Sequence, residues 1–281
     1  MRILVTGAKG QLGMELMKKL KGEDVFGIDK EIDIVDEAKI TTYIISLNPD
    51  VIIHTAAYVD VDKAETDVIR ALKVNICGTI NIVKACKKIN SKLIYISTDY
   101  VFNGSGDMCY EVGDKKDALS VYGFSKAIGE DFISMNLEKY YIIRTSWVFG
   151  YHGNNFIKSM LSIKEKKEIN VVCDQIGSIT YTVDLSKAIC DIIKTDKYGT
   201  YHITNEGIIS WYDLAVEIFK MKDIDITVKP ILTKDYLKLF PSKAIRPLNS
   251  RLSKKTLIDN GFGLLPFWKD ALKRYLKELE E

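Results

Sequence analysis

Three glycines near the amino terminus constrain the fold more than any other feature of the chain. Gly7, Gly10 and Gly13 directly follow the apolar run of residues 3–5 and stand where a helical pattern begins. Glycine permits a tight turn and lets a diphosphate approach the backbone, while the free N–H groups at the start of the helix bind the anion. The spacing therefore predicts a strand–turn–helix unit that binds the diphosphate of a dinucleotide.

The rest of the first half alternates between two kinds of segment. Apolar runs typical of buried strands occupy residues 25–28, 51–54, 92–97 and 140–145. Longer helical patterns occupy residues 11–20, 36–47, 67–89 and 121–137. Such alternation indicates an α/β fold, a Rossmann-like doubly wound parallel sheet with helices on both faces. We expect this dinucleotide-binding domain to occupy residues 1–150.

The pattern loosens beyond residue 150. Helices are expected at residues 155–164, 211–219 and 267–279, and short strands near Val171 and at residues 200–203. We interpret residues 151–281 mainly as a smaller carboxyl-terminal α/β lobe that binds the substrate, with later segments returning to the first domain.

Composition narrows the classes of partner. The 281 residues carry 40 basic and 38 acidic side chains, a formal charge of +2, so nucleic acid is not an expected partner. No stretch approaches the roughly 18 apolar residues of a membrane-spanning helix. The five cysteines have no Cys-x-x-Cys pair, and the three histidines lack metal-ligand spacing. We expect a cytoplasmic protein with free thiols, no membrane partner and no catalytic metal.

An acidic residue at the end of the second apolar run bears on the choice of cofactor. Asp29 follows residues 25–28 and can accept hydrogen bonds from the adenosine ribose hydroxyls. Its charge would repel a 2′-phosphate, which favours NADH, but Lys30 partly offsets that repulsion and leaves NADPH open. Asp33 is expected at the adenine edge, and Asp36 as the N-cap of the next helix.

One tyrosine and one lysine form the candidate catalytic pair. Tyr122 and Lys126 are four residues apart at the start of a predicted helix, so they share one face of it. A nearby ammonium favours the phenolate of a tyrosine and so tunes it for proton transfer. Thr98 follows the strand of residues 92–97, at the sheet edge where such folds bind ligands. Its hydroxyl can hydrogen-bond a carbonyl oxygen that gains negative charge.

At these residues the chain resembles the extended short-chain dehydrogenase/reductases, and within them the dTDP-4-dehydrorhamnose reductase family. The resemblance runs nearly end to end. It rests on the segments 7–13, 56–57, 61–65, 97–102, 122–126, 144–149, 154–156, 174–175, 210–213 and 246–252. One departure is Ile179, which stands where the family usually has proline.

The resemblance implies reduction of the C4 ketone of dTDP-4-dehydro-L-rhamnose, a step of dTDP-rhamnose biosynthesis for cell-surface polysaccharide. It implies that Thr98, Tyr122 and Lys126 are catalytic. The implied cofactor contacts are Gly7, Gly10, Gln11, Leu12, Gly13, Asp29, Asp33, Ile34, Thr55, Ala56, Ala57, Ile96, Tyr122 and Lys126. The implied substrate contacts are Thr98, Asp99 and Trp147, and Arg246 and Arg251 are candidate diphosphate ligands or structural ion-pair partners.

Several alternatives stay open. A ketoreductase for another nucleotide-deoxysugar would share every motif, because pocket shape sets sugar specificity. A non-catalytic subunit similar to the regulatory subunit of methionine adenosyltransferase would bind nucleotide without needing the full triad. A 4,6-dehydratase would carry glutamate where Tyr100 stands, and a 4-epimerase fits the motifs less well. Asn75 either supports the proton relay or bridges backbone segments, and a homodimer remains possible.

Overall fold

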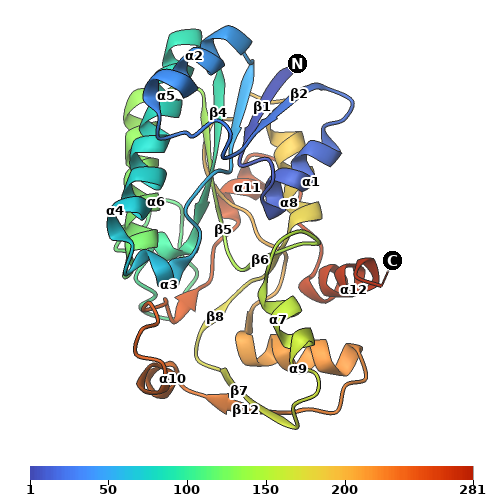
Figure 1. Ribbon diagram of the computed structural model, residues 1–281. Helices are drawn as coiled ribbons and strands as arrows, with labels where there is room; N and C mark the ends of the chain where they lie inside the picture. Colours follow the sequence, from blue (N-terminus) through green and yellow to red (C-terminus); the bar gives the residue numbers. More distant parts are fainter. Residues whose placement is uncertain (281) are drawn as a thin grey trace.

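A six-stranded parallel sheet forms the centre of the molecule. The computed structural model describes residues 1–280, and the sheet order is β10-β5-β4-β3-β1-β2. Figure 1 shows this sheet with β1, β2, β4 and β5 labelled. The strands are β1 (Arg2–Thr6), β2 (Asp24–Ile28), β3 (Val51–His54), β4 (Lys92–Thr98), β5 (Tyr140–Thr145) and β10 (Gly199–His202). β2 lies on one side of β1, and the later strands lie on the other side, beginning with β3. A doubly wound sheet binds its ligand at this change of order, beyond the carboxyl ends of β1 and β3.

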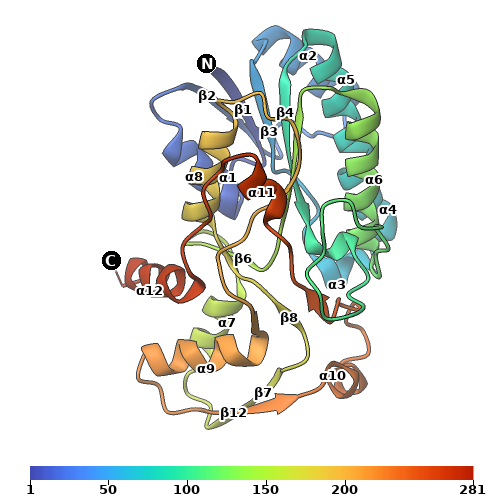
Figure 2. The ribbon, with the colours of Figure 1, turned by 180° about the vertical axis from the view of Figure 1, so that it is seen from behind.

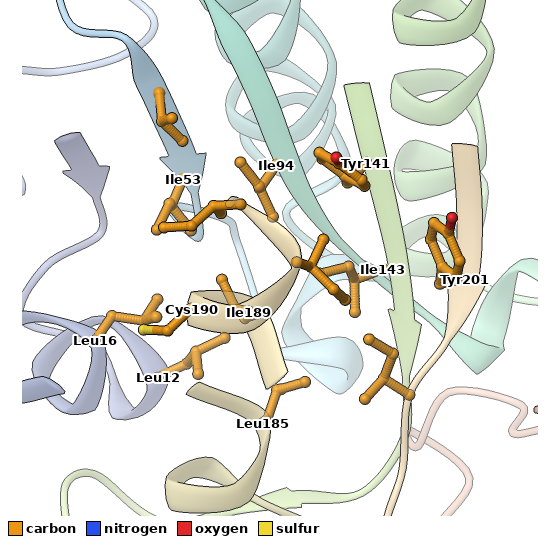
Figure 3. Close-up of a cluster of buried hydrophobic side chains, with 14 of the residues drawn as sticks. Leu12, Leu16, Ile53, Ile94, Tyr141, Ile143, Leu185, Ile189, Cys190 and Tyr201 are labelled. Atoms are coloured by element: carbon orange, nitrogen blue, oxygen red, sulfur yellow. The ribbon is translucent and has the colours of Figure 1, made fainter. Parts of the chain in front are cut away.

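Helices cover both faces of this sheet. One face packs against α1 (Gln11–Lys19) and α8 (Thr182–Ile192), and the other against α2 (Glu37–Leu47), α5 (Thr79–Ile89) and α6 (Val121–Asn136). Successive strand residues point to opposite faces, so Ile53 joins Leu16 and Ile189 in one core (Figure 3) while Ile52 joins the other. The predicted fold class is confirmed.

The last strand of the sheet comes from late in the chain. β10 pairs in parallel with β5, with Gly199 opposite Tyr141 and His202 opposite Arg144. The sequence pattern predicted residues 200–203 as a short strand after residue 150 without naming its neighbour, and it predicted that later segments return to the first domain; β10 is such a segment. Periodicity identifies a strand but not its neighbour, because pairing between residues far apart in sequence depends on tertiary packing.

A second, smaller group of elements lies beyond the carboxyl ends of β4 and β5 (Figure 2). It contains α7 (Phe156–Ser162), α9 (Trp211–Met221) and α12 (Trp268–Glu278), which share an apolar core, together with the parallel pair β7 (Glu168–Val172) and β12 (Thr227–Ile231). Short strands connect this group to the sheet: β6 (Val148–Phe149), β8 (Ile176–Gly177), β9 (Thr180–Tyr181), β11 (Ile209–Ser210) and β13 (Asn249–Ser250). The second half of the chain also contains α10 (Thr233–Leu239) and α11 (Lys255–Asp259).

The predicted helix of residues 67–89 is not uniform. It comprises α4 (Val68–Leu72), a π-helical turn η1 (Lys73–Gly78) and α5, and it is preceded by the short helix α3 (Val61–Ala64). A π turn changes which side chains face inward, and here it buries Asn75. Elsewhere Asp36 caps α2 as expected, by accepting a hydrogen bond from the Lys39 amide. Among residues 1–280, no helix has the length and apolar character needed to cross a bilayer.

Candidate active site

A large cavity lies where the two groups of elements meet. Its volume is about 800 Å³, and its walls include the glycine turn, the ends of β4 and β5, and side chains of the second lobe. A second cavity of about 540 Å³ adjoins it and shares Gly7, Asp29 and Ala57 with it. The two cavities together are lined by every residue that the resemblance implied for the cofactor, with Asp33, Ile34 and Ala56 in the smaller one.

The glycine turn packs so closely against its surroundings that a side chain at Gly7 or Gly13 would collide with backbone atoms. Gly7 has a φ of +69°, and a Cβ there would lie 2.7 Å from the Ala56 amide nitrogen. A Cβ on Gly13 would collide with the Gly7 carbonyl oxygen, because α1 starts directly against the end of β1. Asp29 lies beside the turn and accepts hydrogen bonds from the amides of Lys9 (3.1 Å) and Lys30 (2.9 Å). This cradle fits the diphosphate and ribose of a dinucleotide.

Tyr122 and Lys126 occupy the first turns of α6 and face the larger cavity. The helix begins at Ser120, whose hydroxyl accepts a hydrogen bond from the Gly123 amide at 3.1 Å. Burial raises the pKa of Tyr122, and the charge of Asp99 raises it further. Burial also lowers the pKa of Lys126 to about 7, against an opposing effect of Glu130. The tyrosine is therefore held as a phenol, a proton donor, beside a lysine poised near neutral pH.

Thr98 and Asp99 complete this wall of the cavity at the end of β4. The Thr98 hydroxyl donates to Asp99 Oδ1 at 3.0 Å and also interacts with Tyr122. The Asp99 side chain is buried, and its Oδ2 has no hydrogen-bond partner among residues 1–280. Burial raises the pKa of Asp99 to about 6, although the neighbouring hydroxyls of Ser250 and Thr98 oppose the shift. An unpartnered acceptor in a cavity is suited to a hydroxyl of a ligand.

A buried ionic network connects α6 to β4 and β5. Glu130, two turns after Tyr122, pairs with Arg144 Nη2 at 2.7 Å and accepts from the Ser97 hydroxyl at 2.5 Å. Arg144 also contacts His202 Nε2 at 3.3 Å. Sequence reasoning did not identify Glu130 as part of the site, although its spacing of four from Lys126 placed it on the same helix face.

Aromatic side chains form the wall contributed by the second lobe. Trp147 has a φ of +48° and stacks on Trp211 with 3.8 Å between ring centroids. Phe156 packs on Trp211 at 4.6 Å, and all these side chains line the cavity. Trp147 was expected here, but Trp211 and Phe156 were missed as site residues. Each lies in a segment that carried the family resemblance, yet nothing local to either shows that they meet.

The two candidate arginines have different surroundings. Arg246 lines the larger cavity and pairs with Asp62 at 3.0 Å. Arg251 instead donates to Asn249 Oδ1 at 2.9 Å, and it is absent from the cavity wall formed by the described residues. The structure thus brings one arginine to the site and keeps the other in a local turn.

Asn75 holds backbone and helix together. Its Oδ1 accepts from the Tyr58 amide at 2.7 Å, and its Nδ2 donates to the Tyr58 carbonyl at 3.2 Å and to Ser125 Oγ at 2.8 Å. Because both ends of the carboxamide are occupied, the geometry favours the bridging role. Asn75 connects the segment after β3 to α6, and so helps to fix the helix that carries Tyr122.

A doubly wound sheet, a glycine cradle at the start of α1 and a Thr–Tyr–Lys group on one cavity wall define the extended short-chain dehydrogenase/reductases. Within that class, the family model described as RmlD substrate binding domain matches residues 1–281, and the chain belongs to that family. The resemblance seen in the sequence motifs is thereby confirmed.

Relatives cover the chain almost completely. A dTDP-4-dehydrorhamnose reductase of Aggregatibacter actinomycetemcomitans is 41% identical over 97% of both chains. The spore coat polysaccharide biosynthesis protein SpsK of Bacillus subtilis is 37% identical over 99% of this chain and 97% of its own length. A crystal structure of dTDP-4-dehydrorhamnose reductase from Bacillus anthracis in complex with NADP has a TM-score of 0.94 and 39% identity, with 99% of each chain covered.

Proposed function

We propose that this protein reduces the C4 ketone of dTDP-4-dehydro-L-rhamnose to give dTDP-L-rhamnose. The observation that carries the proposal is that Thr98, Tyr122 and Lys126 share one cavity with the glycine cradle and with Trp147. The relatives named dTDP-4-dehydrorhamnose reductase support the choice of reaction and substrate.

The residues divide the chemistry between them. Reduced nicotinamide, when bound, supplies the hydride that converts the ketone into an alkoxide. Thr98 donates a hydrogen bond to the carbonyl oxygen as its charge grows, and Tyr122 gives that oxygen its proton. The high pKa of Tyr122 keeps this proton in place until the alkoxide forms. Lys126, as an ammonium, then stabilises the phenolate left behind.

The sugar and its diphosphate would contact residues from both lobes. The apolar faces of Trp147 and Trp211 suit the deoxygenated side of the sugar, and the free Oδ2 of Asp99 suits a sugar hydroxyl. Arg246 is the candidate for the diphosphate, whereas the local contact of Arg251 with Asn249 offers no support for such a role. Although both parts contact the sugar, we propose that residues 1–150 mainly bind the dinucleotide and that residues 151–281 mainly bind the substrate.

We propose NADH as the favoured cofactor, with NADPH also accepted. Asp29 stands where a ribose hydroxyl would bind, and its charge opposes a 2′-phosphate. The smaller cavity also contains Lys30, Lys63 and Arg70, whose charges offset that repulsion, and a relative was crystallised with NADP. Replacing Asp29 with Asn should raise KM for NADH and lower KM for NADPH. An unchanged ratio of the two KM values would count against this role of Asp29.

We also propose that the protein acts in the cytoplasm. The free state of its cysteines, Cys77, Cys86, Cys109, Cys173 and Cys190, agrees with a reducing compartment. Cell fractionation with an antibody to the protein would test this, and recovery in a secreted fraction would contradict it.

The reaction is tested by mixing purified protein with enzymatically generated dTDP-4-dehydro-L-rhamnose and following oxidation of NADH and NADPH. Tyr122→Phe should lower kcat by on the order of 10²–10⁴-fold, because it removes the proton donor. Tyr43→Phe, on α2, is the matched control and should retain activity. Absence of oxidation with either cofactor, despite dinucleotide binding, would refute the reductase and favour a non-catalytic nucleotide-binding role. Oxidation of the cofactor only with another nucleotide-deoxysugar would show that the protein is a ketoreductase for that sugar instead.

A further inference from the structure

One carboxylate beside the larger cavity connects elements that are far apart in sequence. Asp62 lies on α3 and lines the cavity. Its side chain accepts from Lys243 Nζ at 2.7 Å, from the Ala244 amide at 3.0 Å and from Arg246 Nη2 at 3.0 Å. The segment of residues 243–246, which follows α10, is thus attached to the dinucleotide-binding part of the protein at the cavity wall.

These contacts fix the direction of the Arg246 side chain. Nη2 is bound to Asp62, and Nη1 donates to the Ala244 carbonyl at 3.2 Å. The guanidinium also interacts with Tyr100, whose ring meets that of Tyr122 edge-on at 6.0 Å. Burial lowers the pKa of Arg246, but the hydrogen bond to Asp62 and the charge of that carboxylate outweigh burial, so the pKa is raised. Arg246 is therefore a permanently charged group near the candidate proton donor.

The cluster of Asp62, Lys243 and Arg246 lies beside a cavity whose other charged side chains are mainly acidic. Asp29, Asp60, Asp62 and Asp99 line the wall, while the cations that line it are Lys126 and Arg246. A diphosphate would be repelled by an uncompensated Asp62. Lys243 lies behind Asp62 and, with Arg246, outweighs its charge, so the cluster as a whole is cationic. Asp62 accepts a hydrogen bond from each of the two cations and so holds both in place.

We propose that Asp62 is a positioning residue that holds Arg246 towards the diphosphate of the nucleotide sugar, with Lys243 neutralising Asp62 from the other side. This rests on the proposed function only in that the substrate carries a diphosphate. Guanidinium groups bind phosphate oxygens best when their planar donors are fixed in advance, because less side-chain freedom is lost on binding. The sequence analysis assigned no role to Lys243 or to Asp62, although Asp62 lies in the segment 61–65 that carried the family resemblance.

The experiment measures KM for the nucleotide sugar, KM for NADH and kcat in Asp62→Ala, Asp62→Glu and Lys243→Met. Asp62→Ala should raise KM for the nucleotide sugar by about tenfold, since it frees Arg246, while kcat and KM for NADH stay within about twofold. Asp62→Glu, which retains the charge, should recover part of the loss. Lys243→Met should also raise KM for the nucleotide sugar, because it leaves the Asp62 charge less compensated.

A remote ion pair provides the control. Glu37→Gln removes the partner of Lys84 in a pair of similar length, 2.8 Å, on the surface of α2, and it should leave both KM values unchanged. A KM for the nucleotide sugar that stays at the wild-type value in Asp62→Ala, even with a lower melting temperature, would overturn the proposal. If Asp62→Ala does not fold, an unchanged KM in Lys243→Met would overturn it instead. A wild-type protein that does not turn over the substrate would refute the proposed function rather than this inference.

Discussion

The Lys126 ammonium lies 3.9 Å from the centroid of the Tyr95 ring, so the face of a buried aromatic side chain covers the charge. Tyr95 belongs to β4 and Lys126 to α6, which fixes the ammonium between sheet and helix. The ring face stabilises the cation. Burial lowers the pKa of Lys126 and outweighs the opposing charge of Glu130.

The first prediction concerns the pH dependence of the free enzyme. Because the pKa of Lys126 is about 7, kcat/KM should fall as pH rises through neutrality and the ammonium is lost. Glu130→Gln removes the charge that opposes this shift, so the fall should move to lower pH. Asp131→Asn, which alters the exposed neighbour that binds Lys116, is the control and should leave the profile in place. An unshifted profile in Glu130→Gln would contradict the assigned role of Lys126.

The second prediction concerns the glycine cradle. In Gly13→Ala the added methyl group would collide with the Gly7 carbonyl oxygen, so α1 must move away from β1. Dinucleotide affinity should fall by at least about tenfold, measured by quenching of protein fluorescence or by calorimetry. Gly22→Ala is a suitable control because a methyl group there meets nothing within 4 Å. Equal affinities for the two variants would show that the turn does not bind the cofactor.

A third prediction separates the sugar site from the cofactor site. A methyl group on Gly177 would lie 2.9 Å from Ser250 Cβ and 3.2 Å from the Trp147 ring, so Gly177→Ala must displace the indole. KM for the nucleotide sugar should rise by about threefold or more, while KM for NADH stays constant. A larger change in KM for NADH than for the sugar would mean that Trp147 does not contact the sugar.

The fourth prediction concerns stability in acid. Burial lowers the pKa of His54 to about 3, whereas an unfolded histidine titrates near its ordinary value of 6.5. The unfolded state therefore takes up the proton first, and the free energy of unfolding should fall as pH drops from about 6.5 towards 3. His202, whose pKa burial also lowers to about 3, adds to this slope.

Urea denaturation at about pH 7 and about pH 5 tests this acid dependence. His54→Gln should be less stable at neutral pH, because His54 joins Thr6 Oγ1 at 2.7 Å to Thr79 Oγ1 at 3.1 Å. It should also lose less stability between the two pH values than the wild type does. A slope in His54→Gln equal to that of the wild type would contradict the assignment.

Local patterns predicted the parts of the protein that depend on short-range geometry. The spacing of Gly7 to Gly13 and the interval from Tyr122 to Lys126 each lie within one turn or helix, so sequence alone could place them on one structural feature. The structure then brings both features to one cavity. Their catalytic and binding roles stay predictions until they are measured.

Local sequence patterns could not predict contacts between segments that are far apart in the chain. Trp147 meets Trp211, and Asp62 meets Arg246, across long stretches of chain that sheet pairing and lobe packing bring together. The pairing of β10 with β5 was missed for the same reason. Short strands such as β8 and β13 carry too few residues for a periodicity to be read.

The return of the chain to the sheet limits how this architecture can diversify. β10 borders β5, and α8 packs with α1 in the same core, although both come after residue 150. A chimera that exchanged the carboxyl-terminal half with that of a relative would therefore replace one edge of the sheet and part of its core together with the sugar site. New sugar preferences in such proteins should accumulate through changes at individual wall positions, because the two halves do not behave as interchangeable modules.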